Sequence, residues 1–159
     1  MLHAAATSLL DCPEAWLDAV RPGVGLYLGA LRVSCQLACA RDCTGPIGST
    51  RFAAPRVGVI LAGYSNHLQP GPALVNGRPQ RILEVGMNTS YVSIDPADKE
   101  GDEVVLLGDG LTETALAEHF AVRPHEILCR YSSIGVREYA RTRHQASPHP
   151  VAAASPVST

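Results

Sequence analysis

The chain has 159 residues and a mass of 16.8 kDa, which is enough for one domain of ordinary size or for one domain with part of another. Apolar residues make up 46% and charged residues 18%, so the chain can bury a core and is not disordered throughout. The net charge of −2 and the isoelectric point of about 6.3 exclude the strongly basic balance typical of nucleic-acid-binding domains, so we expect no nucleic-acid partner.

The sequence also predicts the compartment. It has no apolar run of roughly 18 residues or more, so we expect no membrane span. No basic stretch followed by a long apolar region stands at the N-terminus, so no secretory signal is expected. The five cysteines are an odd number in a chain that is not small, which argues against a disulfide framework and favours a reducing cytoplasm.

The first thirty residues predict two elements. Residues 8–20 place apolar side chains at near-helical spacing, with Pro13 near the first turn, and predict a short amphipathic helix. In residues 24–28, Val24, Leu26 and Leu28 alternate with Gly25 and Tyr27, which predicts a strand that ends in a turn at Gly29.

From residue 31 to residue 107 the pattern is typical of a β-protein. Short runs rich in valine, isoleucine and leucine alternate with turns such as Asn76-Gly77 and Gly108-Asp109-Gly110. This spacing predicts a barrel or a sandwich. The runs are VSCQLACA, PRVGVILAGY, PALV, RILEVGM, YVSI and DEVVLLG.

The last part of the chain predicts two helices. Residues 112–120 form the first, with Thr112 as N-cap, and residues 124–130 form the second, with Pro124 at its start. A last strand is expected near residues 136–139. The tail from residue 143 to residue 159 has no periodicity and little to bury, which predicts disorder.

Cysteines and histidines give no convincing metal site. Cys35, Cys39 and Cys43 stand four residues apart, a spacing that on a strand separates neighbouring thiols by roughly 13 Å. A single zinc ion needs its thiolates at about 2.3 Å, so we expect ordinary half-buried thiols and no metal. Among the six histidines only His67, in the turn behind Tyr64, is a weak candidate for a function.

The stretch GVILAGYSNHLQPG, residues 58–71, places Tyr64 where an apolar strand ends. A tyrosine there can simply pack at the rim of a sheet, or it can take part in chemistry. Two other stretches favour chemistry. Arg21-Pro22-Gly23 offers a guanidinium and free backbone N–H groups, which suit a phosphate or a ring nitrogen, and Gly86-Met87-Asn88 ends a second strand.

The order of these motifs resembles the alanine racemase family over roughly residues 3–140. HAAATSLLDCPEAWLDAVRPGVGLY resembles the last strand–helix–strand of the family's (β/α)₈ barrel. GYSNHLQPGPALVNGRPQRILEVGMNTSYVSIDPADKEGDEVVLLG resembles its C-terminal β-domain, and ALAEHFAVRPHEILCRYSSIGVREY resembles its closing segment. The resemblance implies a mainly β fold, a β-barrel domain with short helices that follows a remnant of the (β/α)₈ barrel.

The resemblance also implies a site. In this family pyridoxal phosphate is linked to a lysine near the start of the barrel, and that lysine and a tyrosine from the other subunit act as two bases on opposite faces of the substrate. By resemblance, Tyr64 is the tyrosine, Arg21 faces the pyridine nitrogen, Gly23 and Val24 bind the phosphate, and Met87 lies near the substrate carboxylate. A phenol, with an ordinary pKa of about 10, needs a cationic neighbour to act as a base near neutral pH.

The sequence departs from the family pattern at several positions. The first strands of the barrel are missing together with the cofactor lysine, and the only lysine, Lys99, stands in an acidic turn. The usual Tyr-Ala-Asp-Gly reads here as residues 64–67, YSNH, and the usual Met-Asp reads as Met87-Asn88, so two carboxylates are replaced by amides.

We therefore expect residues 1–30 to be the barrel remnant, residues 31–142 the β-domain, and residues 143–159 the tail. The first hypothesis is a portion of an amino-acid racemase that acts on alanine and supplies Tyr64 to a barrel on another chain. The second is a non-catalytic relic or dimerisation module, and the third a cofactor-free isomerase or cyclase. Apolar side chains of the barrel remnant would be exposed in a monomer, so we expect a homo-oligomer or a partner that carries the barrel.

Overall fold

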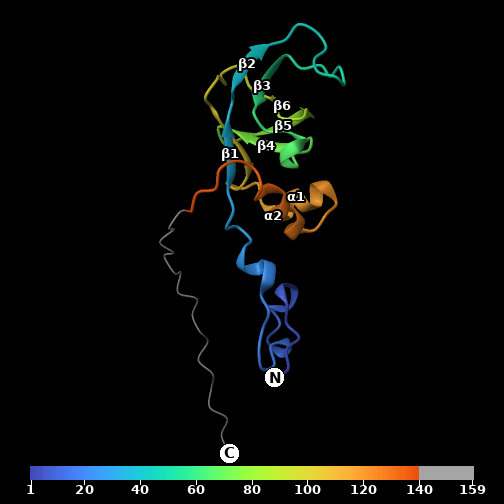
Figure 1. Ribbon diagram of the computed structural model, residues 1–159, viewed down its shortest axis with the longest axis vertical. Coiled ribbons are helices and arrows are strands. Elements are labelled where there is room, and N and C mark those ends of the chain that lie inside the picture. The colour runs from blue at the N-terminus through green and yellow to red at the C-terminus, as the bar shows by residue number, and fades with distance from the viewer. Residues whose placement is uncertain (140–159) are drawn as a thin grey trace, which may run out of the picture.

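The computed structural model describes residues 1–139 and shows a curved β-sheet with two helices at one end and a separate N-terminal segment below them (Figure 1). The predicted disordered tail, residues 143–159, lies outside the described residues. Within residues 1–139, no helix has the length and the apolar character needed to cross a membrane.

One sheet contains all seven strands of the described residues, in the order β1-β7-β4-β5-β6-β3-β2, and every neighbouring pair is antiparallel. This confirms the predicted mainly β fold. Five of the six apolar runs each overlap one strand, whereas the run VSCQLACA divides between two strands, β1 and β2. The strands are β1 Val33–Gln36, β2 Cys39–Asp42, β3 Arg56–Ile60, β4 Gly71–Val75, β5 Arg78–Val85, β6 Ser90–Ser93 and β7 Glu103–Leu107.

The two edge strands, β1 and β2, are consecutive in the chain, so the sheet curls into a barrel-like shape. Between them the Leu37 amide donates to the Asp102 carbonyl, on the β7 side, and the Ala38 amide donates to the Val59 carbonyl of β3. Leu37 is buried at this bend, and a Cβ on Gly58 would lie 2.5 Å from its Cδ2 atom. A glycine in the middle of β3 is therefore what gives Leu37 its place in the core.

The predicted turn at Asn76-Gly77 is a two-residue hairpin between β4 and β5. Val75 pairs with Arg78, and both turn residues have positive φ, 48° at Asn76 and 75° at Gly77. This is the backbone of a type I′ turn, which matches the right-handed twist of the strands.

Both predicted helices are present, α1 at Glu113–Phe120 and α2 at Pro124–Tyr131. The Thr112 hydroxyl caps α1 by accepting a hydrogen bond of 3.2 Å from the Ala115 amide. Leu116 of α1 and Ile127 of α2 belong to the core cluster, which also contains Val104, Leu106 and Leu107 of β7. Because both faces of β7 are buried, this strand reads as a continuous apolar run.

The N-terminal predictions of secondary structure are wrong. Residues 8–20 form short 3-10 turns at Thr7–Leu9 and Pro13–Ala15 instead of a helix, and residues 24–28 form a 3-10 turn at Gly23–Leu26 instead of a strand. Cys12, which precedes Pro13, has extended backbone angles, as residues before proline usually do, and this interrupts the helix. The expected strand at 136–139 is also absent, and these residues are exposed and in no regular element.

A carboxylate fixes the long loop between β2 and β3 to the sheet. Glu84 of β5 accepts hydrogen bonds from the backbone amides of Ser49, at 2.9 Å, and Thr50, at 2.8 Å, and from the Thr50 hydroxyl. The Thr50 hydroxyl and amide and then the Ser49 amide lower the pKa of Glu84 from its ordinary 4.5 to about 2. Gly48 lies so close to this carboxylate that a Cβ would contact it at 2.5 Å.

We predict that Glu84→Gln loosens this loop, because an uncharged amide accepts weaker hydrogen bonds than a carboxylate. Hydrogen exchange measured by NMR should become several-fold faster at the Ser49 and Thr50 amides, whereas Glu118→Gln on the exposed face of α1 should leave it unchanged. The folded-state pKa of Glu84 lies below its ordinary value, so its stabilisation is complete above about pH 4.5 and is lost as the pH falls toward about 2. A variant that still shows this pH step would contradict the assignment.

Candidate functional site

Tyr64 and Met87 lie next to each other on one exposed unit at the end of β3 and β5. Tyr64 begins the 3-10 turn Tyr64–Asn66, and its amide donates to the Gly86 carbonyl at 3.0 Å. The next amide, of Ser65, donates to the Met87 carbonyl at 3.1 Å. Both predicted side chains point to solvent, with 55% of Tyr64 and 60% of Met87 exposed. The phenol is therefore not packed into the core at the rim of the sheet.

The backbone of the turn is shaped by Gly63 and His67. A Cβ on Gly63 would overlap the carbonyl oxygens of Gly86 and Met87, so only glycine lets the two segments approach this closely. The Gly63 amide donates to the side-chain oxygen of Asn66 at 3.2 Å. His67 ends the turn with φ of 62° and ψ of 17°, in the left-handed region that favours glycine.

A side-chain hydrogen bond adds to this junction. The Ser65 hydroxyl donates to the Asn88 side-chain oxygen at 2.7 Å, and on the core side the buried Ser90 hydroxyl donates to the Ala62 carbonyl at 2.6 Å. Sequence reasoning noted Asn88 only as a replaced aspartate and did not find its contact with Ser65. The only available signal was that each of the two apolar runs ended in a glycine, with a polar residue two positions later, Ser65 and Asn88.

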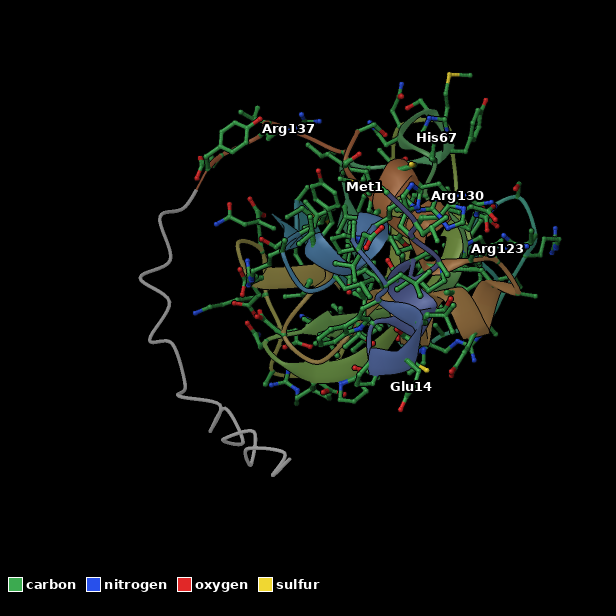
Figure 2. The ribbon with its side chains drawn as sticks, turned by 90° about the horizontal axis from the view of Figure 1, so that it is seen from below. Met1, Glu14, His67, Arg123, Arg130 and Arg137 are labelled. Atoms are coloured by element: carbon green, nitrogen blue, oxygen red, sulfur yellow. The ribbon has the colours of Figure 1, made fainter. Side chains whose placement is uncertain are left out.

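Basic and polar residues flank this unit on the side of α2. Figure 2 shows His67 and Arg130 on the same side of the molecule, and Arg130 donates to the Gln69 side chain at 3.5 Å. His67, the weak histidine candidate, thus lies beside the Tyr64 turn, but within residues 1–139 its side chain makes no hydrogen bond that would give it a defined role.

The other predicted residues, Arg21, Gly23 and Val24, form a second group in the N-terminal segment. Arg21 forms a parallel bridge with Ala6, and its amide donates to the Ala5 carbonyl at 2.7 Å. Gly23 has φ of 48° and begins the turn that contains Val24. Within residues 1–139, the amides of Gly23 and Val24 donate to no other group, and the Arg21 guanidinium has no acidic partner. Two adjacent free amides and a free cation suit an anionic ligand.

Thr7 supports the Gly23 turn. Its hydroxyl donates to the Pro22 carbonyl and accepts a hydrogen bond of 3.0 Å from the Gly25 amide. The fold brings Thr7 to the turn of Gly23 and Val24, although 16 positions separate Thr7 from Gly23 in the sequence.

The two groups do not meet within the chain. In Figure 1 the N-terminal segment extends below α1 and α2, away from the strand ends that carry the Tyr64 turn. No hydrogen bond or ion pair among the described residues joins Arg21 to Tyr64. The link to the β-domain includes a bond of 2.9 Å from the Gly29 amide to the buried carboxylate of Glu113.

An apolar cavity of about 470 Å³ opens between the N-terminal segment and α2. The side chain of Val24 lines it together with Tyr27, Leu31 and Leu128, whereas neither Tyr64 nor Met87 reaches it. Val24 thus belongs both to the turn with free amides and to the lining of this cavity.

The cysteines and the single lysine lie outside both groups. Cys35 and Cys39 belong to β1 and β2, and burial raises the pKa of the Cys35 thiol to about 11, which keeps it protonated. In the described part of the chain, no three histidine, cysteine or acidic side chains gather as metal ligands would. Lys99 is exposed in the turn before β7, where its amide donates to Asp102 at 2.9 Å.

Comparison with known proteins shows the class of this fold. The family profile described as "Alanine racemase, C-terminal domain" matches residues 50–139. The alanine racemase of Aeromonas hydrophila is 30% identical over 165 residues, which cover 86% of this chain and 46% of that protein. The biosynthetic alanine racemase of Escherichia coli is 31% identical over 168 residues, with the same two coverages of 86% and 46%.

The solved structures agree. The biosynthetic alanine racemase of Pseudomonas aeruginosa has a TM-score of 0.73 and 26% identity to this chain, and it is matched over 86% of this chain and 46% of its own length. The curled sheet with two helices is thus a β-domain of the alanine racemase type. The chain belongs to the alanine racemase family, and it spans about half the length of the curated relatives that it matches.

We predict that Gly63→Ala destabilises the protein by about 1–3 kcal/mol, because the added methyl group forces the Tyr64 turn away from the Gly86 and Met87 carbonyls. Urea denaturation measures the change. Gly45→Ala is the matched control, because a Cβ there meets nothing within 4 Å, and its effect should stay within about 0.5 kcal/mol. Equal stability of the two variants would show that the junction tolerates a side chain.

Proposed function

We propose that the chain is the C-terminal portion of a pyridoxal-phosphate-dependent amino-acid racemase that interconverts L- and D-alanine. In this proposal the chain supplies Tyr64 to a barrel that another chain carries. The observation that carries the proposal is the exposed Tyr64–Met87 unit. The amides of Tyr64 and Ser65 fix the backbone of the turn, and the phenol has no partner of its own in the described chain.

The separation of the two groups supports a shared site. A ligand bound at Arg21, Gly23 and Val24 would lie in the N-terminal segment, away from Tyr64 of the same chain. One chain therefore carries two separate parts of the proposed site, and these parts do not face each other. Two copies can combine these parts if Tyr64 of one copy reaches the ligand held by the N-terminal segment and the barrel of the other, which fits the family membership.

The single parallel contact among residues 1–139 supports the barrel remnant that we propose for residues 1–30. All strand pairs of the sheet are antiparallel, whereas Ala6 and Arg21 pair in parallel and are joined by residues 7–20. Parallel neighbours need such a crossover of about a dozen residues or more, as in a β-α-β unit. The remnant thus keeps the connectivity of a barrel unit although its helix and its strands are almost lost.

The N-terminal residues fit part of pyridoxal phosphate. The free amides of Gly23 and Val24 would bind the phosphate, with Thr7 supporting their turn, and the Arg21 guanidinium would face the ring nitrogen. Lys99 does not fit, because it lies in an exposed turn of the β-domain. When bound, the cofactor withdraws electrons from the α-carbon of the amino acid and so makes its hydrogen acidic.

Tyr64 would move a proton at its phenolic oxygen. An exposed ring on a rigid turn can approach one face of a substrate that a barrel presents, while the partner surface excludes water from the contact. The carbonyl of Met87 is occupied by the Ser65 amide, so the backbone around Met87 is already fixed before a substrate carboxylate arrives.

A non-catalytic dimerisation module is the second candidate. Asn66 and Asn88 stand where the family resemblance places carboxylates, and both act in local structure, Asn66 by capping Gly63 and Asn88 by accepting from Ser65. A turn that has exchanged its charges for local hydrogen bonds is consistent with a domain kept for assembly alone.

We predict that the purified chain has no residue that binds pyridoxal phosphate covalently in a defined site. After mixing with the cofactor and reduction with borohydride, no single residue should carry it in stoichiometric amount. Lys99 is the only lysine and is not near the Gly23 turn. The visible absorbance of the mixture, and then mass spectrometry of the reduced protein, measure whether the cofactor is attached. A stoichiometric yellow adduct on Lys99 would contradict the proposal.

We predict that the chain, combined with a racemase barrel that lacks its own β-domain, restores exchange of the α-hydrogen of alanine with deuterium from solvent. Tyr64→Phe should lower this exchange by about 100-fold or more, because the variant has no phenolic oxygen to carry the proton. Tyr91→Phe is the control, because Tyr91 lies in β6 against Phe52 and should keep the activity. Exchange that survives Tyr64→Phe would favour the dimerisation module.

A further inference from the structure

The apolar cavity between the N-terminal segment and α2 has the properties of a ligand site. Its volume of about 470 Å³ lies in the range of small-molecule pockets, which are mostly apolar and carry a few polar groups. In Figure 1, α2 lies where the N-terminal segment joins the β-domain, so the cavity has one wall on each. The wall of the segment includes Val24, Tyr27 and Ala30, and the wall of α2 includes His125, Leu128 and Cys129.

The wall formed by α2 is not the face with which this helix packs on the core. Ile127 and Tyr131 are buried and belong to the core cluster. His125, Leu128 and Cys129 stand three and four positions apart, which places them together on another stripe of the helix. Leu128 is half-buried and is not among the apolar side chains packed against the core. Its apolar surface therefore contributes to the cavity and not to the core.

Two aromatic rings stand on the two walls. Tyr27 belongs to the segment, and His125 belongs to the first turn of α2. Within residues 1–139, neither the Tyr27 hydroxyl nor the His125 ring has a hydrogen-bond partner, whereas the Ser132 hydroxyl already donates to the Cys129 carbonyl at 3.1 Å. Such rings pack against a flat aromatic molecule, and their polar atoms can bind a hydroxyl group on it.

The lining of the cavity also selects against charge. Among the described residues, no arginine, lysine, aspartate or glutamate lines it. A charged molecule would lose its water there without gaining a side chain of opposite charge, which is unfavourable. Pyridoxal phosphate is an anion and an amino acid is a zwitterion at neutral pH, so neither fits this cavity.

A ligand in the cavity would contact both walls and so join the segment to the β-domain. Among the described residues, a single hydrogen bond joins residues 1–30 to the rest of the chain, the bond of 2.9 Å from the Gly29 amide to Glu113. We propose that the cavity binds an uncharged aromatic small molecule, and that this molecule fixes the N-terminal segment against α2. The inference goes beyond the proposed racemase function and does not depend on Tyr64.

Titration with 2-naphthol, a neutral aromatic molecule with one hydroxyl group, tests the proposal. NMR follows the methyl signals of Val24, Ala30 and Leu128, which all line the cavity. We expect saturable shifts with a dissociation constant of about 1 mM or below. The amides of residues 24–31 should exchange their hydrogens several-fold more slowly when the ligand is bound. 2-Naphthoate has the same rings with a carboxylate, and it should bind about tenfold more weakly or worse.

Two variants locate the binding. Ala30→Trp fills the cavity from an exposed position and should weaken the binding of 2-naphthol about tenfold or more, because the ligand loses its space. Leu26→Ala is the matched control, because Leu26 is exposed in the neighbouring turn and does not line the cavity. It should bind as the parent chain does. The NMR signals of the sheet check that each variant is folded.

The absence of saturable shifts at the lining methyl groups would overturn the inference. Equal affinity for 2-naphthol and 2-naphthoate would do the same, since the cavity would then not select against charge, and so would unchanged affinity in Ala30→Trp. Saturable binding that leaves hydrogen exchange at residues 24–31 unchanged would overturn the fixing of the segment. None of these measurements involves exchange of the α-hydrogen of alanine, so the proposed function is tested separately.

Discussion

The close approach of Gly63 to the carbonyls of Gly86 and Met87 is the contact on which the candidate site depends. Two strand ends that are more than twenty residues apart in the chain become one unit there, because a glycine leaves room and the amides of Tyr64 and Ser65 reach the opposite carbonyls. The exposed phenol owes its fixed position to this backbone contact and not to burial of its ring. The backbone of the turn is thus fixed while the ring of Tyr64 is open to solvent, as the proposed function requires.

The sheet supplies the rigidity behind that unit. β7 is buried on both faces, and the bend from β1 to β2 at Leu37 brings the edges of the sheet round a common core with α1 and α2. β3 and β5, which lead to the Tyr64 turn and the Met87 loop, both pair with β6 between them. The two ends of the site are therefore held at a fixed separation by a shared neighbour in the sheet.

The N-terminal segment has the opposite character. Its apolar residues are exposed, its amides are partly unpaired, and its structure consists of 3-10 turns joined by one parallel bridge. Alternation at residues 24–28 and helical spacing at 8–20 are genuine patterns of the sequence, yet neither element forms. A strand needs a neighbouring strand to pair with its backbone, and an amphipathic helix of this length needs a surface that covers its apolar face. Neither element forms here because residues 1–28 have no such neighbour among the described residues.

The sequence by itself determined the β-domain, because its strands and helices carry their own signals: buried runs bounded by glycine and asparagine turns, a threonine cap, and a proline at the start of α2. It also determined which residues to consider, because the order of the motifs resembles the alanine racemase family. This resemblance singled out Tyr64, Arg21, Gly23, Val24 and Met87. Only the tertiary structure decided how these residues are grouped. Tyr64 and Met87 meet because two strands that are not neighbours in the sheet end together, whereas Arg21 lies in another part of the molecule. A local pattern of residues cannot predict these distances, because they arise only when distant segments come together in the fold.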